Sequence, residues 1–153
     1  MGKLDSFKIM SNEEFNIFNK LYKTGESLGC KIVFKPRRYG CRILFTTPSN
    51  KKMLFWMEFS NNRLHVKANL IYIDKYIEKI PIISDNIKNS IISTETCKNC
   101  SPHCGSPHIS FHIDNIEYNP CYFKGHYFTK MDESDWNILS DLIVLENNIR
   151  IIP

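Results

Sequence analysis

Four short runs of apolar residues, separated by turn-forming sequences, constrain the fold of this chain more than any other feature. Apolar side chains recur at alternate positions within the runs, as in half-buried strands. The runs are Cys30–Lys35, Cys41–Thr47, Met53–Phe59 and Arg63–Tyr72. The connections hold Pro, Gly, Ser and Asn and are too short for a crossover, so neighbouring strands must be antiparallel. The sequence therefore predicts an antiparallel β-meander.

Alternation along these runs also predicts which side chains share a face of the sheet. We expect one apolar face, packed against helices, made by Ile32, Phe34, Ile43, Phe45, Phe55, Met57, Phe59, Leu64, Val66, Ala68 and Leu70. We expect the opposite face to carry Lys31, Lys35, Arg42, Trp56, Glu58, His65 and Lys67. A shift of one residue in the strand register would exchange the two faces.

Helix-start patterns lie on both sides of the predicted sheet. Ser11 and Glu14 have the spacing of a capping box and predict a helix over residues 12–28. Asp132 opens a final helix that extends to about Asn147, with acidic residues at its positive end. Two short helices are expected at 74–80 and 84–93, with Ser84 as the N-cap of the second.

A hairpin and one further strand complete the expected fold. Asp114-Asn115 is a hairpin turn between strands at 108–113 and 117–118, and another strand is expected at 122–129. A length of 153 residues, with 42% hydrophobic and 24% charged residues, suits one folded domain. We therefore expect a single α+β domain over 1–153, with residues 1–93 and 94–153 as its two parts.

Three cysteines fall close together at Cys97, Cys100 and Cys104, and Cys121 follows the predicted hairpin. Cys-x₂-Cys spacing lets two sulfurs approach one ion from a tight turn, and four thiolates complete the tetrahedral shell that Zn²⁺ prefers. A closed shell leaves no position for water. The sequence therefore predicts a structural zinc that organises a zinc-knuckle-like hairpin and the final helix.

Other chemistries for these cysteines stay open. An iron–sulfur cluster is the alternative metal group, although three residues precede the third cysteine here and two in the bacterial ferredoxin run. His103, His108 or His126 could take the place of one cysteine. The cysteines could also remain metal-free thiols, or act as a redox pair or as a nucleophile.

The sequence also predicts where in the cell the protein is found. The N-terminal residues lack the continuous apolar core of a signal peptide, and no apolar run approaches the roughly 20 residues of a spanning helix. We therefore expect a cytoplasmic protein with no membrane partner. Thiols stay reduced in the cytosol, which favours metal binding over disulfides.

Positive charge is concentrated in one part of the chain. Residues 31–67 hold nine Lys and Arg against the single acid Glu58, although the whole chain carries only +4. A cationic sheet face with an exposed aromatic is typical of a nucleic-acid-binding surface. The candidate residues are Lys31, Lys35, Arg37, Arg38, Arg42, Trp56 and Lys67. The simpler interpretation is that a half-exposed antiparallel sheet carries polar residues outside whatever its function.

Residues 97–146 resemble certain small, uncharacterised bacterial proteins. The resemblance rests on Cys97, Cys100 and Cys104, the segment Ile113-Asp-Asn-Ile-Glu-Tyr118, Cys121, Tyr127-Phe128 and the acidic helix that starts at Asp132. Asn115 stands where those proteins usually have Gly, and Asn also adopts the left-handed turn conformation. The resemblance implies a bacterial source and cysteines that act together, but it implies no activity.

These observations favour a non-enzymatic cytosolic binding module with a structural zinc site and an unidentified ligand or protein partner. The alternative is a nucleic-acid-binding or regulatory domain that uses the basic sheet face. A second alternative is a thiol-based enzyme or redox sensor. The sequence contains neither a phosphate-cradling glycine loop nor a nucleophile elbow.

Overall fold

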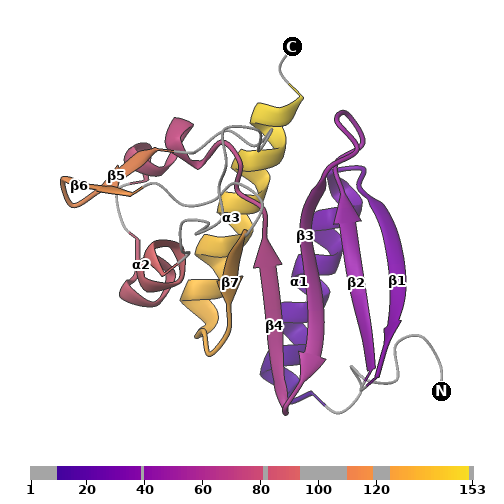
Figure 1. Cartoon of the computed structure of the whole chain (residues 1–153). Helices are drawn as coiled ribbons and strands as arrows, with labels where there is room; N and C mark the ends of the chain where they lie inside the picture. The colour runs from indigo at the N-terminus through magenta and orange to yellow at the C-terminus, as the bar shows by residue number, and fades with distance from the viewer. Residues whose placement is uncertain (1–9, 39, 81–82, 94–109, 119–124, 152–153) are drawn as a thin grey trace.

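The computed structural model describes residues 10–38, 40–80, 83–93, 110–118 and 125–151. Its main sheet has five strands in the order β1-β2-β3-β4-β7, and every neighbouring pair is antiparallel (Figure 1). The strands are β1 (Lys31–Arg37), β2 (Gly40–Thr46), β3 (Met53–Ser60), β4 (Arg63–Ala68) and β7 (His126–Phe128). The predicted meander is confirmed, and β7 extends it by pairing with β4.

The predicted division of the sheet into two faces is also confirmed. Ile43, Phe45, Phe55 and Met57 are fully buried, as are their neighbours on β4, so this face forms the core. The rings of Phe45 and Phe55 stack with centroids 4.2 Å apart across the β2–β3 pair. On β1, the expected core side chains are only partly buried because this strand lies at the edge of the sheet.

Two long helices lie on the apolar side of the sheet (Figure 1). Helix α1 (Asn12–Ser27) starts at Ser11, whose hydroxyl accepts a hydrogen bond from the Glu14 backbone N–H at 3.2 Å. Helix α3 (Glu133–Arg150) starts with a capping box between Asp132 and Asp135. These caps supply partners to backbone donors that a helix start leaves without one, as the sequence predicts.

Gly25 shows why α1 tolerates a glycine near its end. A Cβ at this position would lie 2.2 Å from Cδ1 of Phe45, so only a residue without a side chain lets the helix approach the sheet this closely.

A smaller layer of structure follows β4. It contains two 3₁₀ turns, η2 (Ile73–Lys75) and η3 (Ile77–Lys79), and the short helix α2 (Asp85–Ile92) with Ser84 as its N-cap. Strands β5 (Phe111–Ile113) and β6 (Ile116–Tyr118) form a separate hairpin. Its turn residues Asp114 and Asn115 have φ angles of 53° and 66°, which confirms the predicted hairpin turn.

Several predicted boundaries differ from the structure. The segment expected to be one short helix over 74–80 instead holds the two 3₁₀ turns η2 and η3, separated by Tyr76 at φ −132°. Strand β4 ends at Ala68, short of the predicted Tyr72, because the chain turns back at Asn69, whose carbonyl accepts a hydrogen bond from Ile71 N–H at 3.0 Å.

The final helix extends past the predicted Asn147 to Arg150, whose side chain is fully buried. Arg150 Nε lies 2.8 Å from Glu146 Oε2, and its Nη1 donates to Thr47 Oγ1 at 3.0 Å and to the Met53 carbonyl at 3.1 Å. Its Nη2 donates to the Asn69 carbonyl at 2.5 Å. One guanidinium therefore joins the end of α3 to the β2–β3 connection and to the end of β4.

Candidate functional site

One side of the sheet faces away from helices α1 and α3 (Figure 1). By strand alternation it carries six cations, at Lys31, Lys35, Arg37, Arg42, Arg63 and Lys67, against the single acid Glu58. Six minus one leaves a net charge of +5. We call these seven residues, together with Trp56, His65 and Tyr127, the basic face. Arg38 lies next to it, exposed in the turn after β1.

The strand register arranges the basic face in two cross-strand rows. The first row holds Lys35, Arg42, Glu58 and His65, and the second holds Leu44, Trp56, Lys67 and Tyr127. Most of the positions predicted for nucleic-acid binding thus lie on one surface. Directly opposed residues in such rows are close enough for their side chains to interact.

Glu58 offsets part of the positive charge. Its Oε2 accepts hydrogen bonds from Arg42 Nε at 3.2 Å and Nη2 at 2.8 Å, and its Oε1 lies 4.0 Å from Arg37 Nε. Within the described part of the chain, Lys31, Lys35 and Lys67 make no ion pair, so their charges are available to an anionic ligand.

The pKa of Lys67 reflects the positive charge around it. Burial lowers the pKa of its ammonium group, and the positive charge of Arg42 lowers this pKa further. Two cations are therefore held close enough to disfavour each other. A bound anion between them would relieve that repulsion.

The expectation that Trp56 is an exposed stacking surface is wrong. Its side chain is only 7% exposed, because neighbouring side chains on the same face cover it. The Arg42 guanidinium lies 3.9 Å from the centre of the Trp56 ring, in a cation–π contact. Tyr127 packs its ring edge-on at a centroid distance of 6.1 Å and an interplanar angle of 67°.

Tyr127 is the exposed aromatic of this face, and sequence reasoning did not select it. Its side chain is 47% exposed, and its hydroxyl lies 2.7 Å from His65 Nδ1. His65 Nε2 lies 3.0 Å from the Ser60 carbonyl, which can only accept, so Nε2 carries a proton and donates to this oxygen. His65 lies on the outer face, where the sequence pattern placed it, but these two contacts bury it.

The four candidate metal ligands, Cys97, Cys100, Cys104 and Cys121, lie outside the described residues, as do His103 and His108. Among the residues that the structure does describe, no group of three or more His, Cys, Asp or Glu side chains could hold a metal ion. The zinc site therefore stays a prediction.

The structure describes the residues that flank the two cysteine-bearing segments. Residues 94–109 lie between α2 and β5, and residues 119–124 lie between β6 and β7. Phe111 pairs with Tyr118 at the open end of the β5–β6 hairpin, so both segments meet the described structure at this end. The other ends of the two segments meet it at α2 and β7, two elements that His126 joins through a hydrogen bond to the backbone of Ile91.

His126, the one candidate histidine ligand that is described, is almost fully buried between α2 and β7. Burial lowers the pKa of its imidazole to about 4, although the hydrogen bond to the Ile91 backbone opposes this effect. The ring is therefore neutral at pH 7. Its contact with Ile91 gives it a structural role that does not depend on a metal.

The two remaining cysteines have features of structural residues. Cys41 is buried in the core, and Cys30 is partly buried at the other end of the β1–β2 pair. Burial raises the pKa of the Cys30 thiol, although Arg150 opposes this effect. A raised pKa leaves little thiolate at neutral pH, so Cys30 is a weak nucleophile.

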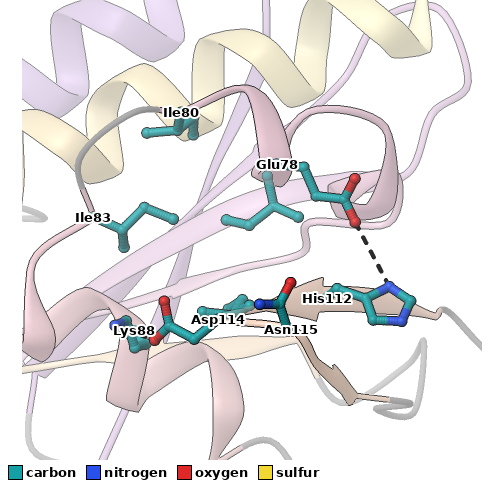
Figure 2. A pocket seen from close by; sticks show the side chains of 9 residues that line it. Glu78, Ile80, Ile83, Lys88, His112, Asp114 and Asn115 are labelled. Carbon is teal, nitrogen blue, oxygen red and sulfur yellow. Dashed lines mark hydrogen bonds and ion pairs between the residues drawn. The ribbon is translucent and has the colours of Figure 1, made fainter.

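A pocket of about 650 Å³ lies between η3 and the β5–β6 hairpin (Figure 2). Ile77, Ile80, Ile83 and Ile113 supply its apolar lining. Two pairs of polar side chains lie at its edge: His112 Nδ1 is 3.6 Å from Glu78 Oε1, and Lys88 Nζ is 2.6 Å from Asp114 Oδ2. Sequence reasoning missed this pocket because it depends on how the hairpin docks against η3.

Comparison with known proteins adds no family or activity to these observations. The chain matches no protein-family model, no curated protein and no solved structure. Within the described ranges, none of the helices has the length and apolar character needed to cross a bilayer.

Proposed function

We propose that this chain is a non-enzymatic cytosolic binding module in which Cys97, Cys100, Cys104 and Cys121 hold a structural zinc ion. The observation that carries this proposal is the Phe111–Tyr118 pair, because each of its two residues lies next to one of the cysteine-bearing segments in the sequence. The zinc would stabilise the cysteine-bearing segments themselves, which have few apolar side chains.

Chain length supports a common site. Cys121 follows Tyr118 by three residues and Cys104 precedes Phe111 by seven. At up to about 3.5 Å per residue, these sulfurs can lie roughly 10 Å and 25 Å from the hairpin end at most, so both can reach one point. Cys97 follows Ser93, the residue at the end of α2, by four residues, and α2 is itself bonded to β7, which follows Cys121.

The donor set favours zinc in a closed shell. Four thiolates match tetrahedral Zn²⁺, and a site without an open position has a structural role. An iron–sulfur cluster uses the same ligands and is the alternative occupant. Cysteine-bound metal would also make these thiols react slowly with alkylating reagents, whereas a thiol-based enzyme would hold one reactive cysteine.

Metal analysis of the purified protein tests this proposal. We expect one zinc per chain in the wild type and in Cys30→Ser, a control that removes a cysteine outside the proposed site. Cys97→Ser and Cys121→Ser should each lose zinc and lower the melting temperature. A folded wild-type protein without zinc or iron would contradict the proposal, and a folded protein with stoichiometric iron would assign the cluster instead.

As a second candidate, we propose that the basic face binds nucleic acid. The observation that favours it is the net charge of +5 on a sheet surface opposite the helices, with an exposed aromatic among the cations. Phosphates would contact Lys31, Lys35 and Lys67, which make no ion pair with any residue that the structure describes. Because phosphate contacts release bound counterions from the nucleic acid, binding should weaken as the salt concentration rises.

Salt-dependent binding of a labelled 12-nucleotide oligomer tests the second candidate. Lys35→Glu should weaken binding and reduce its dependence on salt, because it removes one phosphate contact and adds a repulsion. Lys23→Glu makes the same charge change at an exposed position of α1, on the other side of the sheet, and should have a much smaller effect. Equal effects of the two variants would show that only overall charge matters and would contradict a site on the basic face.

A further inference from the structure

We infer that Tyr127 is a base-stacking platform and that the basic face therefore takes single-stranded rather than duplex nucleic acid. This inference rests on the second candidate function above. The inference assigns base stacking to Tyr127, whereas the sequence pattern had indicated Trp56 as the aromatic residue of this face.

Tyr127 is held in place by two neighbouring side chains, His65 and Trp56, while part of its ring stays open to solvent. Its hydroxyl is hydrogen-bonded to His65 Nδ1 at 2.7 Å, and its ring lies 5.6 Å from the His65 ring, centre to centre. Its ring also contacts Trp56 edge-on at 6.1 Å. An exposed aromatic with fixed orientation loses little conformational entropy when a ligand stacks on it.

The residues under Tyr127 are themselves held by a connected set of contacts. His65 is bonded to the Ser60 carbonyl, Trp56 is covered by Arg42, and Arg42 is bonded to Glu58. Burial raises the pKa of the Tyr127 hydroxyl, with the charge of Glu58 adding to the effect, so the ring remains neutral at physiological pH. A neutral aromatic ring presents no charge to repel a phosphate next to it.

Cations stand beside this ring. Lys67 is the direct cross-strand partner of Tyr127, and Arg42 is close enough to affect the pKa of both residues. Gly125 precedes β7 with a positive φ of 63°, and a Cβ there would lie 3.0 Å from Lys67 Cε. The close approach of this glycine places the backbone before Tyr127 against the stem of Lys67, which keeps ring and ammonium group together.

An aromatic ring next to cations fits an unpaired nucleotide. Stacking on a protein ring requires a base whose flat face is accessible, and in a duplex both faces of an internal base are covered by its neighbours. Phosphates on either side of the stacked base would meet the lysines. An acidic protein segment would satisfy the cations but would make no use of the ring, so charge complementarity and the aromatic together favour single strands.

The test separates stacking from charge by using two probes of equal charge. Binding of a fluorescein-labelled 12-nucleotide oligo(dT) or oligo(U) is compared with that of an abasic oligomer of the same length, by fluorescence anisotropy at fixed salt. We expect the oligomers with bases to bind at least 5-fold more tightly than the abasic one. A duplex of the same length, measured in the same way, should bind more weakly than the single strand. Equal affinities for the duplex and the single strand would overturn the inference.

Variants of Tyr127 locate the effect. Tyr127→Ala should weaken binding of the oligomers with bases by about 5- to 150-fold, the range for loss of one stacked base, and leave the abasic oligomer nearly unaffected. Tyr127→Phe keeps the ring and should remain within about 3-fold of the wild type. Phe15→Ala removes an aromatic of similar exposure from α1 and serves as the matched control. A photo-crosslink from 4-thiouridine should map to Tyr127.

The outcomes distinguish this inference from the function on which it rests. If oligomers with and without bases bind equally and Tyr127→Ala changes neither, the basic face binds phosphate and the stacking role is wrong. If no oligomer binds the folded wild-type protein, the nucleic-acid function and the stacking role both fail. If Tyr127→Phe loses as much as Tyr127→Ala, the hydroxyl contact with His65, and not the ring, supports binding.

Discussion

Arg150 and Glu146 form an ion pair at 2.8 Å with both side chains fully buried at the end of α3. The pair is not isolated, because Glu146 Oε1 also accepts hydrogen bonds from the Tyr72 backbone N–H at 2.8 Å and from the Tyr76 hydroxyl at 3.1 Å. Burial raises the pKa of Glu146, and the charge and hydrogen bonds of Arg150 act against this. The partners satisfy both charges and fix the segment after β4 against the helix.

Removing one member of this pair should destabilise the protein strongly. Arg150→Met leaves the Glu146 carboxylate buried without its partner and also leaves the Asn69 carbonyl without its donor. We expect a loss of about 3–5 kcal/mol in the free energy of unfolding, measured by urea denaturation. The double variant Glu146→Gln/Arg150→Met should lose less than Arg150→Met alone, because no charge remains buried. A single variant within about 1 kcal/mol of the wild type would contradict this account.

Gly25 should resist substitution although alanine normally favours a helix. Gly25→Ala would gain about 1 kcal/mol of helix propensity, but the new Cβ would overlap the Phe45 ring. Overpacking of a core typically costs about 1–3 kcal/mol, so we expect the variant to be less stable or, at best, equal. Asn16→Ala, at an exposed position of the same helix, should not be destabilised. Thermal unfolding of both variants checks the comparison, and a clearly stabilised Gly25→Ala protein would refute the close contact.

The buried His126 predicts a specific loss of stability in acid. Its folded-state pKa, about 4, lies below the ordinary value of about 6.5, so the unfolded chain takes up the proton first as the pH falls. The contribution is fully present above about pH 6.5 and is lost as the pH falls toward 4, by roughly 3 kcal/mol in total.

Comparison with His126→Gln isolates this effect. Urea denaturation between pH 7.5 and 4.5 should show a flatter pH dependence for the variant than for the wild type. Because the cysteines are the same in both proteins, acid release of a cysteine-bound metal affects both curves. Parallel curves would show that His126 titrates normally in the folded state.

The sheet could be predicted because the residue patterns that determine it lie within single strands and the short connections between them. In β1 to β4 the apolar residues that line the core recur at every second position, and the connections permit only antiparallel neighbours, so pairing and faces follow. Strand β7 pairs with β4 from far along the chain and has only three residues, His126–Phe128. Neither its partner nor the position of Tyr127 beside Trp56 could be read from local pattern.

The exposure of single side chains on the sheet was also beyond a local pattern. Alternation places Trp56 and His65 on the outer face correctly, yet both are buried there by cross-strand neighbours. Arg42 covers Trp56, and Tyr127 covers His65. The buried Arg150 could not be anticipated either, because its partners Thr47, Met53 and Asn69 come from distant connections.

X-ray absorption at the zinc edge tests the central claim most directly, because it reports the atoms bound to the metal in the intact protein. The account predicts a single shell of four sulfur atoms at about 2.3 Å, and its reduction or loss in Cys121→Ser. A shell made of nitrogen or oxygen atoms at about 2.0 Å, or a folded protein with no metal to measure, would contradict it.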